Sequence, residues 1–144
     1  MQALEADANR ECVEHLTKAL RFDEEVRGAL DVDLRRARWA RMLTDASYSL
    51  GDHDAALAWG DRTFRFSGLR VPAHAGHVLG SVAAHVWRRY VPAKQADEDT
   101  RARYAEALVV SSTLQTVATW QGDRVRQLGL AVYAEVVSRA CVPS

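Results

Sequence analysis

The chain has 144 residues, of which 48% are hydrophobic and 26% are charged, and these proportions fit one globular domain with its own core. Its 19 basic and 19 acidic side chains cancel, which argues against a nucleic-acid binder and a polybasic membrane-surface module, because both need a basic surplus. Three prolines and eight glycines supply too few turns for an all-β fold.

Six stretches carry apolar residues at the 3.6-residue spacing of an amphipathic helix, so the sequence predicts an all-α fold without a sheet. We expect the first helix over residues 9–26. Its inward stripe is predicted to contain Cys12, Leu16, Ala19 and Val26, with Val13 and Leu20 beside it.

The second helix is expected over residues 34–50, after an N-cap at Asp33 whose side chain can accept a free amide of the first turn. Gly51 ends it, since glycine adopts the left-handed C-terminal conformation at little steric cost. A third helix follows a cap at Asp52 or Asp54 and reaches Phe66. The inward stripes of these two helices contain Trp39, Leu43, Ala46, Leu50, Ala56, Trp59, Thr63 and Phe66.

The last three helices are expected over residues 73–91, 100–121 and 124–141. Gly122-Asp123 repeats the Gly-Asp pattern found at residues 51–52. The fifth and sixth helices are apolar over more than half of their circumference, so we expect both to be covered on two sides.

The sequence contains no recognisable targeting segment. No apolar run approaches the ~18 residues of a membrane-spanning helix, and the acidic N-terminus lacks the basic and apolar stretches of a secretory signal. We therefore expect a cytoplasmic protein in which Cys12 and Cys141 are reduced, buried thiols.

The helix–Gly-Asp–helix arrangement resembles the tetratricopeptide repeat, with Leu43, Tyr48 and Ala56 where that repeat has large apolar, aromatic and alanine residues. Gly60 and Gly68 depart from the pattern, because a large aromatic residue and a proline are usual there. The resemblance implies antiparallel helix pairs stacked as a short right-handed solenoid, in a single domain over residues 1–144.

A second resemblance covers most of the chain. The order of Asn9-Arg10-Glu11, Leu34-Arg35-Arg36-Ala37-Arg38-Trp39, Leu50-Gly51-Asp52, Val71-Pro72 and Trp87-Arg88-Arg89 is similar to the helical-repeat region of large bacterial signalling ATPases with an amino-terminal nucleotide-cyclase or kinase domain. The resemblance implies a fragment or stand-alone piece of a sensor and scaffold region, with the chemistry in other domains.

Motifs of catalysis and cofactor binding are missing from the sequence. It contains no phosphate-binding glycine loop, dinucleotide fingerprint, serine elbow or zinc-binding His-Glu-x-x-His helix. Acidic runs such as 97–99 lie beside predicted turns, where solvated helix-end charges are more usual than catalytic dyads. The sequence therefore predicts no enzymatic activity, cofactor or metal in this chain.

Histidines on the fourth predicted helix are the one cluster with metal-ligand potential. His74 and His77 could share an ion. His85 could not join them, because it lies ~16 Å from His74 along the helix axis at 1.5 Å per residue, and no further ligand is nearby. A solvated or partner-binding flank is the better interpretation. We predict that His74 and His85 contact a partner together with Trp87 and Arg88, since tryptophan and arginine dominate interface hot spots.

The other tryptophans, Trp39, Trp59 and Trp120, are interpreted as core anchors between helices. The run Arg35-Arg36-Ala37-Arg38 could suggest a nucleic-acid patch, but its arginines fan around the helix and Asp31, Asp33 and Asp45 are close in sequence. A solvated helix face with local ion pairs is predicted there instead.

Two functions from different classes remain. The first is a protein-interaction or regulatory scaffold that holds a protein, a peptide or another domain of a parent protein, with no nucleic acid and no membrane as partner. The second is a small all-α ligand-binding bundle or enzyme, with an inter-helix pocket lined by Tyr104, Gln115 and Trp120.

The C-terminal helix carries two apolar strips. One contains Val125, Leu128, Val132 and Val136, and the other contains Leu130, Ala134 and Val137. Because the packing of one strip leaves the other uncovered, the sequence predicts a two-fold homodimer through this helix.

Overall fold

The computed structural model describes residues 2–28, 32–69 and 97–141, and this part of the chain consists of helices and short turns without a strand. Its helices are α1 (Gln2–Arg27), α2 (Leu34–Ser49), α3 (His53–Phe66), α5 (Glu98–Gln121) and α6 (Arg124–Cys141). The prediction of an all-α fold is confirmed for this part of the chain. The helix expected over residues 73–91 lies outside the described residues, and α1 starts well before the expected residue 9.

α2 and α3 form one antiparallel hairpin, and α5 and α6 form a second with the same turn. Gly51 and Gly122 end the first helix of each hairpin in the left-handed conformation, with φ of +77° and +72°. Each glycine amide donates to the carbonyl three residues back, at 3.0 and 3.2 Å, and the next amide donates to the carbonyl five residues back, at 2.9 Å in both turns. These bonds satisfy carbonyls that a helix end leaves free.

The aspartate after each glycine caps the second helix of its hairpin. Oδ1 of Asp52 accepts the Ala55 amide at 3.0 Å, and Oδ1 of Asp123 accepts the Arg126 amide at 2.9 Å. The predicted repetition of Gly-Asp is therefore a repetition of structure, and Asp52 rather than Asp54 is the cap.

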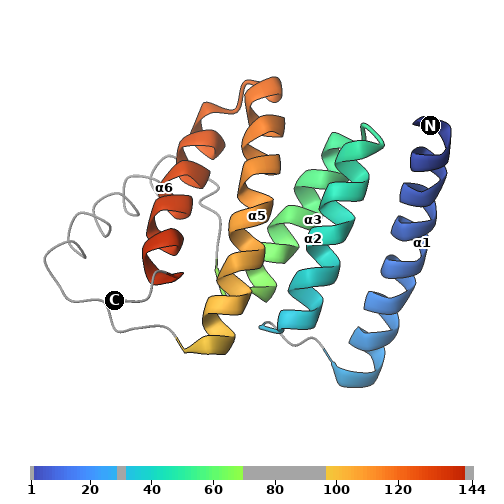
Figure 1. The fold of residues 1–144 in the computed structure, drawn as a ribbon, viewed down its shortest axis with the longest axis horizontal. Coiled ribbons are helices and arrows are strands. Elements are labelled where there is room, and N and C mark those ends of the chain that lie inside the picture. Colours follow the sequence, from blue (N-terminus) through green and yellow to red (C-terminus); the bar gives the residue numbers. More distant parts are fainter. Residues whose placement is uncertain (1, 29–31, 70–96, 142–144) are drawn as a thin grey trace, which may run out of the picture.

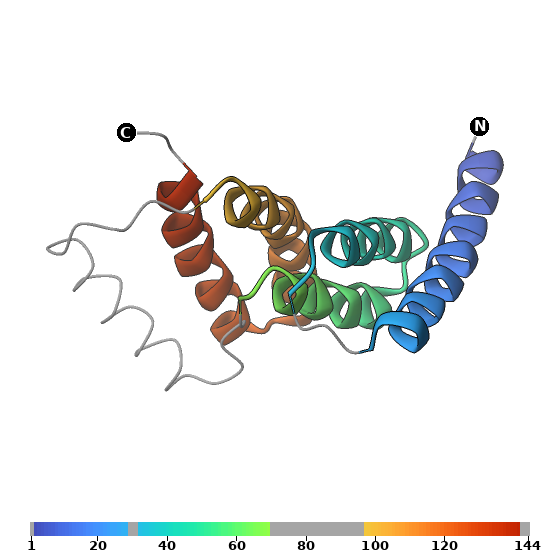
Figure 2. The ribbon, with the colours of Figure 1, turned by 90° about the horizontal axis from the view of Figure 1, so that it is seen from below.

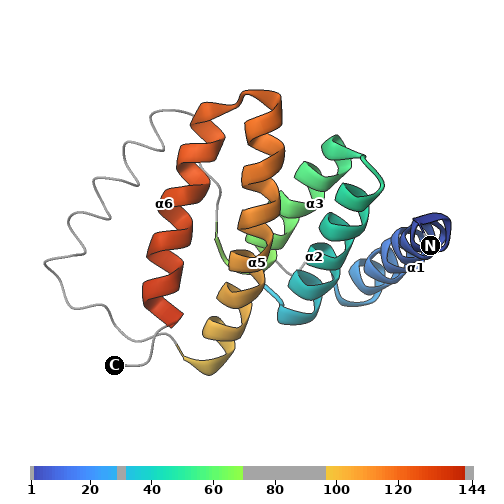
Figure 3. The ribbon, with the colours of Figure 1, turned by 45° about the horizontal axis from the view of Figure 1, so that its top comes forward.

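The two hairpins lie side by side and point the same way, with both glycine turns at one end (Figure 1). Helix α5 packs against both α2 and α3, although residues 67–97 separate it from the first hairpin in sequence. Seen from below, α2 and α5 form one layer and α3 lies in a second layer, drawn beneath α2 (Figure 2). The order α1, α2, α5, α6 across the molecule is clear in the tilted view as well (Figure 3).

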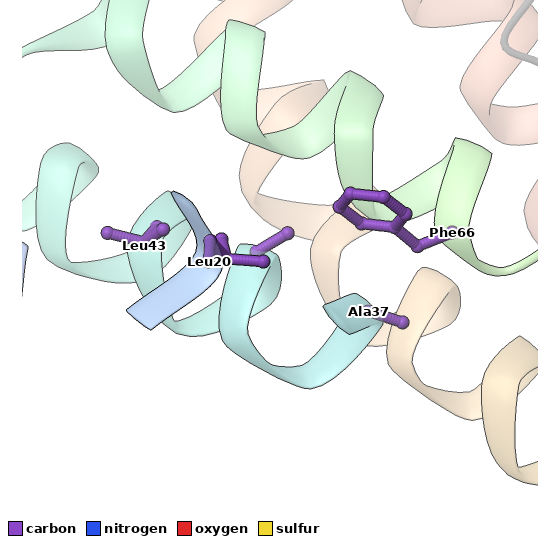
Figure 4. Packing of buried hydrophobic residues seen from close by; sticks show 5 residues of the cluster. Leu20, Ala37, Leu43 and Phe66 are labelled. Carbon is purple, nitrogen blue, oxygen red and sulfur yellow. The ribbon is translucent and has the colours of Figure 1, made fainter. Parts of the chain in front are cut away.

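Each junction between these elements contains buried apolar side chains. The first cluster joins Leu20 of α1 and Phe66 of α3 to Ala37, Ala40 and Leu43 of α2 (Figure 4). The second cluster consists of Phe64, Ala107, Val110, Leu114 and Leu130, and joins α3, α5 and α6. As predicted for the fifth helix, α5 is covered on more than one side, by the first hairpin and by α6.

A close approach between α3 and α5 depends on Gly60. A Cβ atom at this position would lie 2.5 to 2.9 Å from three side-chain carbons of Leu114, which has no exposed surface. The small residue at position 60 therefore lets Leu114 fill the space beside the α3 backbone.

The predicted inward stripe of α1 is wrong at its C-terminal end. Val26 is 66% exposed, whereas Leu20 is buried and Val13 and Leu16 are partly buried. The residue that faces inward at this end of α1 is instead Asp23, which is buried. Asp23 pairs with the guanidinium of Arg36 in α2. The end of α1 is therefore positioned by an ion pair rather than by packing of Val26. Cys12 is half-buried rather than fully buried.

Candidate interaction surface

The predicted partner-binding residues His74, His85, Trp87 and Arg88 lie outside the described residues. Leu43, Gly51 and Ala56, on which the expected resemblance to the tetratricopeptide repeat depends, lie within the described residues. Leu43 and Ala56 have no exposed surface, and Gly51 occupies the left-handed turn. Leu43 and Ala56 therefore belong to the interior of the α2–α3 hairpin, and Gly51 forms its exposed turn.

An ion-pair network joins α2 to α5. The Nε atoms of Arg38 and Arg41 donate to the two carboxylate oxygens of Glu106, at 3.0 and 2.7 Å. Nη1 of Arg41 also donates to Asp45 at 2.9 Å. The side chain of Glu106 is only 15% exposed, so its charge is held by two arginines in a partly desolvated position.

Asp45, which also belongs to this network, has a pKa above the ordinary value of an aspartate. Burial raises the pKa of Asp45 above its ordinary value, against the charge and hydrogen bond of Arg41 and a hydrogen bond from Thr113. Asp45 therefore binds a proton more readily than an exposed aspartate does.

Two apolar side chains lie beside this network and face solvent. Met42 is 41% exposed and follows Arg38 by one helical turn, and Val109 is 51% exposed and follows Glu106 in the same way. Arg38, Met42, Glu106 and Val109 together form what we call the α2–α5 face. It combines exposed apolar atoms with fixed charges, as protein-binding surfaces do.

The arginine run of α2 is not the solvated face that the sequence predicted. Arg36 has no exposed surface, and its Nε donates to Oδ2 of Asp23 at 2.7 Å. Its Nη2 donates to the carbonyls of Asp23 and Gly28, at 3.0 and 2.8 Å. Arg35 pairs with the same Asp23 and lies 5.0 Å from the centre of the Trp39 ring. Ion pairs form, but the end of α1 encloses Arg36, so the prediction is wrong at that residue.

The charges around Asp23 change its titration. Burial raises the pKa of Asp23, but the hydrogen bond from Arg36 and the charges of Arg35, Arg36 and Arg27 together outweigh it and hold the pKa below the ordinary value. Asp23 therefore stays ionised in the folded protein, as the buried Arg36 requires.

The tryptophans divide into two groups. Trp39 and Trp59 pack against the first core cluster, which confirms their predicted role as anchors. Trp120 is 65% exposed and lies against Tyr48 and His53, so its prediction as a core anchor is wrong. Trp120 is also unsuited to line the inter-helix pocket of the alternative hypothesis. Trp87 lies outside the described residues.

In the described part of the chain, no group of three or more His, Cys, Asp or Glu side chains could hold a metal ion. No helix in residues 2–28, 32–69 and 97–141 is long and apolar enough to cross a membrane. Comparisons of the chain with protein-family models, with curated proteins and with solved structures found no match.

Proposed function

We propose that this chain is a protein-interaction module in which TPR-like helix hairpins stack as a short solenoid and hold a peptide segment of a partner. The support is the repeated hairpin: two helix pairs share the same glycine turn and aspartate cap, and the first helix of the second pair packs on both helices of the first. Stacked pairs of this kind are suited to binding extended partners.

The α2–α5 face is the surface that we assign to the partner. Helices α2 and α5 are the corresponding first helices of the two hairpins, and they lie in one layer (Figure 2). Met42 and Val109 would receive apolar side chains of the partner, while Arg38 and Glu106 would fix its polar groups. Such a module serves as a regulatory scaffold, alone or within a larger signalling protein.

Selection from a phage-displayed library of random peptides tests this proposal. We expect selected peptides to bind at least about tenfold more weakly to Met42→Ser and Val109→Ser, because each change removes an apolar contact. Val26→Ser on α1 is the matched control, since Val26 is equally apolar and 66% exposed but distant in sequence from the face. Peptides that bind all three variants alike would contradict the assignment.

The alternative, a ligand-binding bundle, makes a different prediction in a thermal-shift screen of metabolites, nucleotides and metals. Strong stabilisation by one small molecule, together with failure of the peptide selection, would favour it.

We also propose a two-fold homodimer through α6. Val125 is 38% exposed and Leu128 is 55% exposed, one turn apart on this helix, while Leu130 and Val137 of the other strip are buried. Light scattering should give the mass of a dimer for the unaltered chain and of a monomer for Leu128→Glu. A monomer at high micromolar concentration of the unaltered chain would contradict the proposal.

A further inference from the structure

Three aromatic rings from three helices meet at the end of the molecule that carries the glycine turns. The rings of Tyr48 and Trp120 are stacked, with centroids 6.1 Å apart and an interplanar angle of 29°. His53 meets the Trp120 ring at 75° and 5.2 Å, and its centroid lies 5.9 Å from that of Tyr48. We call these residues the Tyr48–His53–Trp120 cluster.

The contacts within the cluster leave much of its surface exposed to solvent. Trp120 remains 65% exposed after packing against both neighbours, which is a large apolar surface for a solvated helix end. Nδ1 of His53 is buried and has no hydrogen-bond partner among the described residues. His53 and Tyr48 thus pack against Trp120, and most of the indole surface is left open to a partner.

The charges next to the cluster are mainly negative. The caps Asp52 and Asp123 and the first-turn residue Asp54 of α3 are exposed, while Arg124 is the basic residue that follows Asp123 in sequence. Oδ1 of Asp54 accepts a hydrogen bond of 3.4 Å from Gln121, the residue that follows Trp120. A carboxylate of α3 thus lies beside Gln121, the residue next to Trp120 in α5.

We propose that the Tyr48–His53–Trp120 cluster binds a cationic side chain, the guanidinium of an arginine, in a partner protein. The face of an indole ring attracts a cation through its quadrupole, and a planar guanidinium can stack on it while it donates to a carboxylate. Asp54 supplies that carboxylate. The site lies apart from the α2–α5 face, so it adds a second contact to the interaction module proposed above and fixes the chemistry of part of its partner.

A tetra-arginine peptide and its tetra-citrulline analogue are the probes, because citrulline keeps the shape of arginine without the charge. In a ¹H–¹⁵N spectrum, the indole signal of Trp120 should move in a saturable way with the arginine peptide and stay in place with the citrulline peptide. The signal is identified by its loss in Trp120→Leu.

Anisotropy of the fluorescein-labelled arginine peptide measures the affinities of the variants. We expect about tenfold weaker binding for Trp120→Leu and about threefold weaker binding for Asp54→Asn. Glu98→Gln is the matched control, since it removes the same charge at the opposite end of α5 and should leave the affinity unchanged.

Three results would overturn the proposal: equal binding of the citrulline peptide, unchanged affinity of Trp120→Leu, or the same weakening by Glu98→Gln as by Asp54→Asn. Met42→Ser and Val109→Ser should leave the arginine peptide bound. If they release it instead, the arginine occupies the α2–α5 face and this cluster is not its site. Failure of the peptide selection alone would contradict the proposed function and not this site.

Discussion

The two junctions of the first hairpin both bury apolar side chains, but the one toward α1 also encloses a fully buried charge. Toward α1, the fully buried Arg36 is neutralised by Asp23 and by two carbonyls of α1 and its C-terminal end. Toward α5, Leu114 fills the space that Gly60 leaves free. The charged junction depends on a partner of opposite sign, whereas the apolar junction depends on volume. Beside its apolar side chains, α1 is thus held by a buried ion pair, whereas α5 is held by the pairing of Glu106 with Arg38 and Arg41 and by the fit of Leu114 against Gly60.

Removal of one partner of the buried Asp23–Arg36 ion pair should give the largest loss of stability. We expect Asp23→Ala to lower the free energy of unfolding by about 3–5 kcal/mol, because Arg36 would remain buried without its counter-charge. Urea denaturation measures the loss. The double variant Asp23→Leu with Arg36→Met should recover most of it, and a double variant as unstable as the single one would mean that the charge is not what matters.

Acid should weaken the same junction. Because the folded-state pKa of Asp23 is lowered, its stabilising contribution is present above the unfolded value of about 3.9 and is lost as the pH falls through the folded value. Asp45 acts in the opposite sense, since its raised pKa favours protonation in the folded state. Urea midpoints measured from neutral pH down to about pH 3 should fall less steeply in Asp23→Asn than in the unaltered chain.

A change of volume should break the apolar junction. Gly60→Leu should cost about 1–3 kcal/mol, because the new side chain overlaps the buried Leu114. The same denaturation experiment with Leu114→Ala added should show partial recovery, since the space is then shared again. If Gly60→Leu is as stable as the parent, α3 and α5 do not approach closely at this point.

The same substitution at the two glycine turns should lower the stability of the protein by the same amount. Gly51→Val and Gly122→Val should each lower stability by about 1–2 kcal/mol, because a β-branched residue is strained at positive φ. A Cβ atom at either glycine would meet no atom within 4 Å beyond its chain neighbours among the described residues, so the expected loss comes mainly from backbone strain. Thermal melts of the two variants check this, and a much larger loss at one site would show that the turns are not equivalent.

The smallest expected effect concerns the caps. Asp52→Ala and Asp123→Ala should each cost about 1 kcal/mol, because each leaves one amide of the first turn unbonded. Asp54→Ala is the control, since Asp54 lies in the same first turn while the cap itself is Asp52. Equal losses at residues 52 and 54 would contradict the assignment of the cap.

Local features of the fold could be predicted from the sequence because their causes are local. Gly51, Gly122 and the Asp33 cap depend on residues within one turn, and the structure confirms all three. The inward stripe of α3 follows from helical periodicity in the same way, since Ala56, Thr63 and Phe66 are buried.

Other features depend on residues distant in sequence, and the sequence predicted them poorly. Arg36 is buried because Asp23, on another helix, faces it, and no spacing within α2 indicates this. Trp120 lies outside the core because its neighbours are Tyr48 and His53 of the other hairpin. The sequence likewise does not indicate Glu106 as the partner of Arg38 and Arg41, because Glu106 lies on another helix, far away in the chain.

The separation of the hairpins along the chain has a consequence for the order of folding. Contacts within each hairpin close over a turn of a few residues, whereas α5 reaches α2 and α3 across residues 67–97. Loop-closure entropy grows only slowly with length, by about 0.6 kcal/mol for each doubling, so this separation is tolerated at equilibrium. It does slow assembly, since non-local contacts form after local ones. Each hairpin should therefore form early from its glycine turn, and the docking of Leu114 against Gly60 should be among the last steps to limit the rate.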